Sequence, residues 1–352
     1  MNWMNRCLAG VAGAWLMVTG LNAADMQPPA GALSNGVPIA TMKNLDEIEP
    51  RTLITRLPFS ISRSGSYYVS APLPGTNGAN GIVISVGDVI IDLNGFTLRG
   101  TNGSLDGIRV TVPCDGLTIR NGSIYGWGGY GIMATNAAHV RIEGVNVTRS
   151  GSGGIYAGKN ALVERCEVYA NGFDAPPSDP PADDGIHVRS YSTIKDCKAF
   201  ANRGAGIHSY QFSQVIGCIA TESMQADGIH VEDFCTVQRC TAARNMENGI
   251  KVGSMSRVSD NICGQNGTSS TNGAGILVVG QNSMIDNNNC CGNYYGYKTH
   301  MLTADGNLYL RNNASNNSND YYFVAGDYFG QVLTPPPGSI INSNPWANFS
   351  TF

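Results

Sequence analysis

The stretch that decides the fold is Gly185-Ile186-His187-Val188, which returns as Gly228-Ile229-His230-Val231 and again as Gly249-Ile250-Lys251-Val252. In an extended strand the Ile and Val of each copy point to one side, and the middle residue points to the other. The Gly-Ile pair recurs every 21 to 31 residues from Gly81 to Gly275. A strand that returns at such a period predicts a solenoid whose equivalent residues stack about 4.8 Å apart.

The composition agrees with an all-β chain that is rich in turns. Gly supplies 44 of the 352 residues, and both Gly and Asn are poor helix formers, which argues against a helical protein. A hydrophobic content of 42 % with only 14 % charged residues excludes a disordered chain. The net charge of −4 gives no support for nucleic-acid binding.

Two further columns accompany the Gly-Ile pair. The first is an inward column of cysteines, for which we favour free thiols over disulfides because small apolar side chains stack well in a core. It comprises Cys166, Cys197, Cys218 and Cys240. The second is a column of Asn at a tight turn, where Asn tolerates left-handed backbone and the stacked amides can bond one another. It comprises Asn171, Asn202, Asn245, Asn266 and Asn293, with Ser223 in its third place. Three short strands and three turns per period predict a parallel β-helix.

The first residues read as a targeting signal. Arg6 precedes an apolar segment, Leu8–Val18, that is too short to cross a bilayer, and the small residue Ala23 suits a cleavage site. Residues 1–23 therefore predict a signal peptide. We expect the mature protein to be secreted, periplasmic or on the cell surface, without a membrane span.

The open ends of a solenoid expose core and strand edges, so we expect a cap at each end. Residues 24–68 are predicted to form a linker and N-terminal cap, with a short helix near Leu45–Ile48. Residues 69–320 are predicted to form the β-helix, with about 10 or 11 coils. Residues 321–352 are predicted to form the C-terminal cap.

The chain resembles secreted right-handed parallel β-helix repeat proteins of the pectate-lyase-like superfamily. The Gly-Ile-x-Val coils from Gly81 to about Asn317 carry the resemblance. Residues 41–52, Gly65–Tyr68 and the tail at 344–349 look like a subgroup common in environmental bacteria. The resemblance implies a single-stranded β-helix with right-handed coils and a carbohydrate-related role. The subgroup supplies no reaction that can be carried over. The Asn-Thr-Asp, Gly-His-Gly and Arg-Ile-Lys motifs of polygalacturonase-type hydrolases are absent, so the catalytic roles of that family are not carried over either.

The middle residues of the first strands predict an ionisable strip on one sheet. Three of the chain's five His fall on consecutive coils of this strip, and a proline-rich insertion, Ala175–Ala182, precedes it as one wall of a cleft. The candidate catalytic residues are His187, His208, His230, Asp184, Asp227, Arg189 and Lys251. The candidate substrate-binding residues are Arg109, Tyr156, Tyr210, Glu232 and Asp183.

The function that we favour from the sequence is β-elimination or C5-epimerisation on an acidic polysaccharide. Such a reaction needs a base, a cation beside the sugar carboxylate and, for elimination, an acid. The His side chains, Arg189 or Lys251, and Tyr210 supply these groups. One alternative is an inverting glycoside hydrolase that uses Asp184 and Asp227, whose backbones are about 9.6 Å apart on coils two steps apart. Another is a non-catalytic carbohydrate-binding or structural protein of the cell surface.

No cofactor is expected from sequence motifs. Cys-x-x-Cys pairs typical of zinc and the repeats of calcium-roll coils are both absent, so no motif supports calcium. Three stacked imidazoles can in principle hold zinc, but stacked strand positions diverge outward as easily as they converge, and we predict no metal. The expected partner is a polysaccharide, and the expected state is a monomer.

Overall fold

The computed structural model describes residues 33–34, 37–38, 50–173, 183–267, 272–300, 305–335 and 342–351. Every regular element within these ranges is a β-strand, and none of the described residues forms a helix capable of crossing a membrane. The expected signal peptide, the expected cap helix and the proline-rich insertion lie outside the described residues. The chain before Arg51 is a separate unit, in which β1 (Leu33–Ser34) pairs antiparallel with β2 (Val37–Pro38).

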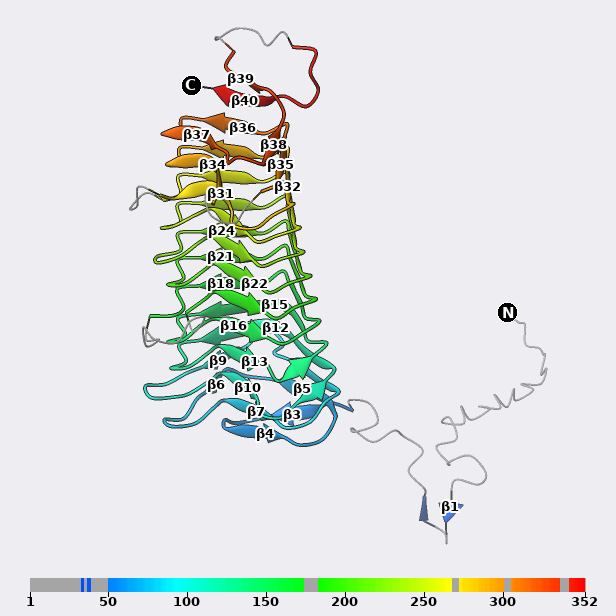
Figure 1. Cartoon of the computed structure of the whole chain (residues 1–352). Coiled ribbons are helices and arrows are strands. Elements are labelled where there is room, and N and C mark those ends of the chain that lie inside the picture. Colours follow the sequence, from blue (N-terminus) through cyan, green and yellow to red (C-terminus); the bar gives the residue numbers. More distant parts are fainter. Residues whose placement is uncertain are drawn as a thin grey trace, which may run out of the picture. The chain divides into compact units, whose positions relative to one another are not determined.

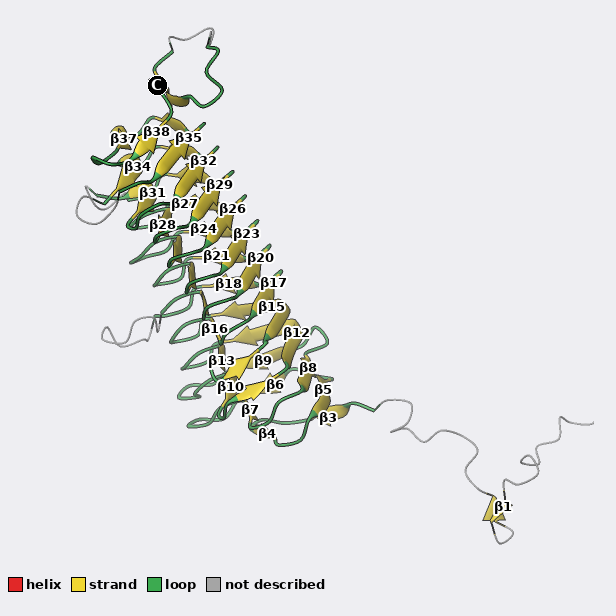
Figure 2. Ribbon diagram, turned by 45° about the vertical axis from the view of Figure 1, so that its right-hand side comes forward, coloured by secondary structure: helices red, strands yellow, loops and turns green. Residues whose placement is uncertain are grey.

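From Arg51 onward the chain winds into a solenoid of parallel strands (Figure 1), and Figure 2 shows the strands of successive coils lying over one another. We name its three columns of strands the first, second and third sheets. The first sheet has twelve strands. They are β4 (Phe59–Ile61), β7 (Ile82–Ile84), β10 (Ile108–Val110), β13 (Ile132–Ala134), β16 (Ile155–Ala157), β19 (Ile186–Val188), β22 (Ile207–Ser209), β25 (Ile229–Val231), β28 (Ile250–Val252), β31 (Ala274–Val278), β34 (Tyr295–Thr299) and β37 (Asn319–Tyr322).

The second and third sheets complete each coil, and the long strands β12 and β15 run through both. The second sheet comprises β3 (Thr52–Ile54), β5 (Gly65–Val69), β8 (Val89–Asp92), β12 (Leu117–Tyr125), β15 (Arg141–Thr148), β17 (Leu162–Glu164), β20 (Thr193–Lys195), β23 (Gln214–Ile216), β26 (Thr236–Gln238), β29 (Arg257–Ser259), β32 (Met284–Asp286), β35 (Leu308–Leu310) and β38 (Tyr328–Phe329). The third adds β6 (Leu73–Pro74), β9 (Thr97–Arg99), β18 (Glu167–Tyr169), β21 (Lys198–Phe200), β24 (Ile219–Thr221), β27 (Thr241–Ala243), β30 (Ile262–Gly264), β33 (Asn289–Cys291), β36 (Asn313–Ser315), β39 (Val332–Leu333) and β40 (Asn348–Thr351). A small pair, β11 (Cys114–Asp115) and β14 (Ala137–Ala138), lies at one corner.

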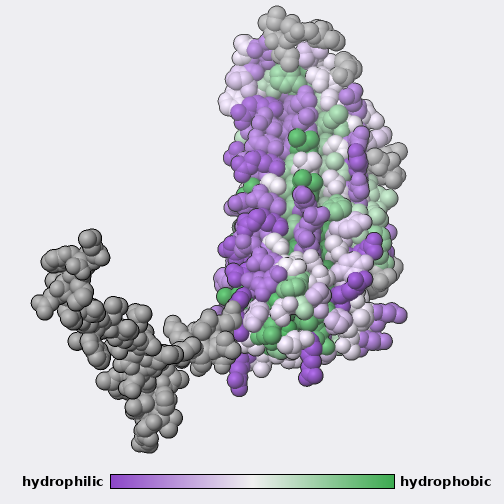
Figure 3. Space-filling model, turned by 180° about the vertical axis from the view of Figure 1, so that it is seen from behind, coloured by the Kyte–Doolittle hydropathy of each residue, from purple (hydrophilic) through white to green (hydrophobic). Residues whose placement is uncertain are grey.

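The predicted alternation places the core inside the coils. In β25, for example, Ile229 and Val231 are buried while His230 between them is partly exposed. The outward residues form columns on the surface as well. Figure 3 shows one face of the molecule, where hydrophilic and hydrophobic residues follow columns along the stack. The expected all-β parallel solenoid is therefore confirmed, and its ladder extends beyond the expected 69–320 span, from β3 to β40.

The asparagine column forms a hydrogen-bonded ladder. The backbone N–H and Nδ2 of Asn245 both donate to Oδ1 of Asn266, at 3.1 and 2.9 Å. Asn266 donates in the same way to Asn293, at 2.9 and 3.0 Å. Ser223 interrupts the ladder, because its buried Oγ has no hydrogen-bond partner. Each intact step ties one coil to the next at the corner that leads into the first sheet.

The cysteine column lies in the core, as its register predicts. Cys166, Cys197, Cys218 and Cys240 are buried, and all nine cysteines of the described residues are free. Cys197 and Cys218 have pKa values far above that of an ordinary thiol, because the hydrogen bond with the cysteine of the next coil and then burial raise them. These thiols therefore stay protonated and serve as small apolar core residues.

Candidate functional site

The outward residues of the first sheet stack in the predicted order. Tyr156, His187, His208, His230 and Lys251 occupy equivalent positions on β16, β19, β22, β25 and β28. Ring centroids are 4.3 Å apart from Tyr156 to His187, 4.3 Å from His187 to His208 and 4.6 Å from His208 to His230. Neighbouring strands of a sheet are about 4.8 Å apart, so rings on successive coils come into contact. The rings of His208 and His230 are parallel to within 1°, whereas His187 is tilted by 46° from His208.

One buried carboxylate holds two of these imidazoles. Asp184, at the start of the coil that carries β19, accepts hydrogen bonds through Oδ2 from Nδ1 of His187 at 3.0 Å and of His208 at 3.1 Å. Its Oδ1 accepts the backbone N–H of Ala205 at 2.8 Å. Burial opposes ionisation, but the hydrogen bonds from the two histidines outweigh it and hold the pKa of Asp184 at about 2. Asp184 is therefore an ionised anchor for both rings.

The ionised anchor fixes the tautomer of both rings. A carboxylate without a proton only accepts hydrogen bonds, so Nδ1 of His187 and of His208 carries the proton, and the neutral ring keeps its lone pair on Nε2. Neither Nε2 has a hydrogen-bond partner among the described residues. Burial also lowers the pKa of His187, which favours its neutral form.

Asp227 occupies the corresponding place two coils further on. Its Oδ1 accepts the backbone N–H of Asn248 at 3.0 Å and Nδ2 of the same residue at 2.7 Å. Its Oδ2 lies 3.9 Å from Nδ1 of His230 and 4.0 Å from Nζ of Lys251. Burial raises the pKa of Asp227. Burial, together with the charges of His208 and Lys251, lowers the pKa of His230 to about 3. His230 is therefore a neutral imidazole near neutral pH.

Asp184, His208 and His230 line a groove of about 350 Å³ over β22 and β25. Its lining comprises Asp183, Asp184, Gly204, Ala205, His208, Tyr210, Gln225, Ala226 and His230. The side chains of His208 and His230 are 15 % and 23 % exposed, whereas that of His187 is 1 % exposed. His187 is not part of an open strip, because the rings of Tyr156, His208 and Tyr210 cover it. His230 is the most exposed imidazole of the stack.

Other predicted residues surround the groove. Burial raises the pKa of Tyr210, which keeps its hydroxyl protonated, and Arg189 is exposed on the coil of β19. Oε1 of Glu232 lies 3.8 Å from Nε2 of His230. Burial, followed by the charge of Asp184, raises the pKa of Asp183.

Arg109 lies apart from the groove. It lies on β10, three strands along the sheet from β19, and Asp106 accepts a hydrogen bond from its Nη1 at 2.5 Å.

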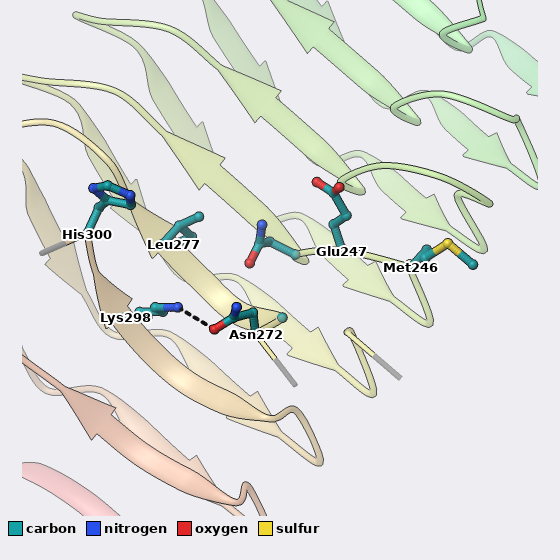
Figure 4. Close-up of a pocket in the computed structure, with 8 residues that line it drawn as sticks. Met246, Glu247, Asn272, Leu277, Lys298 and His300 are labelled. Carbon is teal, nitrogen blue, oxygen red and sulfur yellow. Dashed lines mark hydrogen bonds between the residues drawn. The ribbon is translucent and has the colours of Figure 1, made fainter. Parts of the chain in front are cut away.

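A second hollow, of about 500 Å³, lies further along the first sheet (Figure 4). It is lined by Met246, Glu247, Asn248, Asn272, Gly273, Leu277, Lys298 and His300. Nζ of Lys298 donates a hydrogen bond to Oδ1 of Asn272 at 3.2 Å, and burial raises the pKa of Glu247. Sequence reasoning misses this hollow, although Lys298 follows Leu277 in the same outward series.

Comparisons with known proteins agree with the architecture. Residues 75–219 match the family described as the right handed beta helix region. This match covers less than half of the chain, and it agrees with the parallel β-helix fold. No curated protein matches its sequence.

Several solved structures resemble this β-helix protein. The Dettilon tailspike protein gp208 is 14 % identical with a TM-score of 0.58, over 85 % of this chain and 61 % of the tailspike. The mannuronan C-5 epimerase AlgE4 A-module of Azotobacter vinelandii is 13 % identical with a TM-score of 0.50, over 75 % of this chain and 90 % of the module. The catalytic domain of a GH87 alpha-1,3-glucanase is 12 % identical with a TM-score of 0.52, over 78 % of this chain and 60 % of that domain. Similarity at this level of identity shows a shared fold.

Proposed function

We propose that this β-helix protein binds an acidic polysaccharide along its first sheet and removes the proton beside a sugar carboxylate. The observation that carries the proposal is that the partly exposed imidazole of His230 lines the groove and pairs in register with Lys251 on the following coil. A neutral imidazole accepts a proton, and an ammonium stabilises the charge that develops on a carboxylate. The two groups needed at a uronic acid are thus one strand spacing apart.

The reaction follows from these positions. Nε2 of His230 takes the proton from the carbon next to the carboxylate, and the electron pair spreads onto that carboxylate, which Lys251 stabilises. In elimination the bond from the adjacent carbon to the leaving oxygen then breaks, a carbon–carbon double bond forms, and the hydroxyl of Tyr210 protonates the leaving oxygen. In epimerisation the carbon takes up a proton from the hydroxyl of Tyr210 on its opposite face, and no bond between sugar units breaks.

Substrate binding strengthens the base. The positive charge of Lys251 contributes to the low pKa of His230 in the free protein, after burial and the charge of His208. A bound carboxylate that pairs with Lys251 offsets this contribution and raises the affinity of His230 for a proton. The base is therefore strongest when an anionic sugar occupies the groove.

The second hollow extends the site to a polymer. Lys298 is two strands from Lys251 in the same outward series, or about 9.6 Å along the stack. It can pair with a second carboxylate further along an anionic chain. Structural neighbours that are named for action on polysaccharides share this fold, which supports carbohydrate as the ligand class.

The geometry favours proton abstraction over hydrolysis by two carboxylates. Burial raises the pKa of Asp227, while Asp184 stays ionised, and such a divergence is typical of an acid and base pair. However, the two oxygens of Asp184 already accept three hydrogen bonds, from His187, His208 and Ala205. Asp184 therefore has little capacity left to activate a water molecule.

The test incubates the mature protein with a panel of polyuronates and follows the ultraviolet absorbance of the unsaturated product. Proton NMR detects epimerised units, and a reducing-end assay detects hydrolysis. We expect His230→Gln to lower turnover by about 10²- to 10⁴-fold, the usual contribution of a general base. His139→Gln, at a surface position whose side chain is 66 % exposed, is the matched control and keeps full activity.

Retardation on polysaccharide gels without any of the three products would assign the protein to carbohydrate binding instead. Reducing ends without unsaturated or epimerised units would favour hydrolysis. Full activity of His230→Gln would show that the base lies elsewhere.

A further inference from the structure

The imidazole stack has a carboxylate on its outer side that proton abstraction does not use. Glu232 follows His230 by two residues, so both side chains leave the chain on the same face. Oε1 of Glu232 lies 3.8 Å from Nε2 of His230. One ring nitrogen of His208, one of His230 and one oxygen of Glu232 all lie within 4.8 Å of one another. Two imidazoles and one carboxylate thus lie close together beside the groove.

Each imidazole is backed by a buried carboxylate on its other nitrogen. Nδ1 of His208 is bonded to Asp184 at 3.1 Å, and Nδ1 of His230 lies 3.9 Å from Asp227. Histidines that ligate metals almost always donate their second N–H to such a group, which fixes the tautomer and makes the ligating nitrogen more basic. The Nε2 of His208 is also buried without a hydrogen-bond partner, so a lone pair is left unused.

We propose that Nε2 of His208, Nε2 of His230 and the carboxylate of Glu232 form a binding site for one divalent transition-metal ion of the zinc type. Imidazole and carboxylate ligands suit zinc and its neighbours, whereas calcium and magnesium prefer oxygen ligands alone. Three protein ligands leave a coordination position open toward the groove. The carboxylates of Asp184 and Asp227, which lie behind the two rings, add negative charge that stabilises a bound cation.

The three ligand atoms lie near one another, although they must move closer to hold an ion. In tetrahedral geometry, metal–ligand bonds of about 2.1 Å place two ligand atoms about 3.4 Å apart. The pair formed by His230 and Glu232, at 3.8 Å, is within about 0.4 Å of this value. Separations up to 4.8 Å need to shorten by about 1.4 Å through side-chain rotation, for which Glu232 has room because it is 40 % exposed. The rings of His208 and His230 are parallel to within 1° with centroids 4.6 Å apart, so their in-plane lone pairs run side by side. Binding one ion therefore requires the more exposed ring of His230 to turn toward that of His208.

Metal binding at this site is a property beyond the proposed function, and it is expected to inhibit the proposed reaction. A bound ion occupies the lone pair of His230 that proton abstraction needs, so the loaded protein lacks its base. Zinc is therefore expected to inhibit turnover and a chelator to restore it. Metal binding itself is measured without substrate, so its failure and the failure of the proposed function are separate results.

In the experiment, a chelator first removes any metal from the full mature protein. The protein is then titrated with Co²⁺, because the visible absorption of bound Co²⁺ depends on its ligands. Zn²⁺ is then added in competition. We expect one equivalent to bind, with Glu232→Gln weakening the affinity at least 10-fold. Asp184→Asn is expected to weaken it about 10- to 100-fold, as removal of a supporting carboxylate usually does. The control His139→Gln is expected to bind as the wild type does, and Ca²⁺ and Mg²⁺ are not expected to compete.

Three results would overturn the proposal. The first is a wild-type protein that binds neither Co²⁺ nor Zn²⁺. The second is an affinity that neither Glu232→Gln nor His230→Gln changes while circular dichroism shows both variants to be folded. The third is binding that Asp184→Asn abolishes and Glu232→Gln leaves intact, because the ion would then sit on Asp184, His187 and His208 instead.

Discussion

Ser223 interrupts the asparagine ladder, and its replacement by Asn is expected to stabilise the solenoid. An intact step shows what is missing. Asn266 accepts two hydrogen bonds from Asn245, and its own Nδ2 donates to the carbonyl of Ala242 at 3.0 Å and to Oδ1 of Asn293 at 3.0 Å. At Ser223 only the backbone N–H joins the ladder, at 3.0 Å from Oδ1 of Asn245.

The magnitude follows from the missing bonds. In the variant Ser223→Asn, the new amide is expected to accept two hydrogen bonds from Asn202. It also donates one to the carbonyl of Ala199 and one to Asn245, as the register of the other coils requires. Four bonds at about 1 kcal/mol each, less about 1 kcal/mol for ordering the amide, give about 3 kcal/mol. The neighbouring Gly206 leaves room, just as a glycine adjoins the amides of Asn202 and Asn245.

Urea unfolding, followed by circular dichroism, measures the change. Ser223→Asn is expected to raise the free energy of unfolding by about 3 kcal/mol. Ser223→Ala is the matched control, because it removes the buried hydroxyl without adding an amide and is expected to change stability little. If Ser223→Asn unfolds at or below the urea concentration of the wild type, the amide ladder does not stabilise this solenoid in the way argued.

Asn266→Ala removes the four side-chain bonds of an intact step, so urea unfolding is expected to show a loss of about 4 kcal/mol. A loss well under 1 kcal/mol would contradict the same reasoning. Asp184→Asn removes a carboxylate whose pKa falls from 3.8 to about 2 on folding, which corresponds to about 2.4 kcal/mol of stability. This contribution is fully present above about pH 4 and is lost as the pH falls through 2, so a difference between variant and wild type that stays constant with pH would refute it. Burial raises the pKa of Cys235 from 9.0 to about 11, which lowers its thiolate fraction roughly 80-fold at about pH 8.5. Iodoacetamide labelling read by mass spectrometry is expected to modify Cys235 after unfolding but not in the native protein, and rapid native labelling would count against the buried thiol.

The repeat made most of the fold predictable. A solenoid offers the same environment once per coil, so a periodic position in the sequence translates directly into a column in space. The Gly-Ile pairs located the first sheet, and the spacing of His187, His208 and His230 located the imidazole stack. The asparagine column likewise predicted the ladder, because the amide reaches the next coil. The expected left-handed backbone at these Asn is wrong, because the residue before each of them, such as Ala201 or Arg244, takes the positive φ.

The chemistry of the site was less predictable, because it depends on side-chain rotamers and on residues that belong to different coils. Asp184 bonds a histidine of its own coil and one of the next, and the sequence pattern does not encode that sharing. The burial of His187 depends on the ring of Tyr210 from the adjacent coil. Directions of pKa shifts follow from such burial, so they emerge only once the side chains are placed.

The ladder also makes this protein tolerant of insertions at one corner. The bond from Nδ2 of Asn171 to Asn202 spans 31 residues, and that from Asn266 to Asn293 spans 27, yet both match the 21-residue step from Asn245 to Asn266 in length, at 3.0, 3.0 and 2.9 Å. Extra residues between these anchors therefore leave the stack undisturbed. The corner is a natural position for grafting foreign peptides, and an engineer can vary loop length there while the scaffold keeps its register.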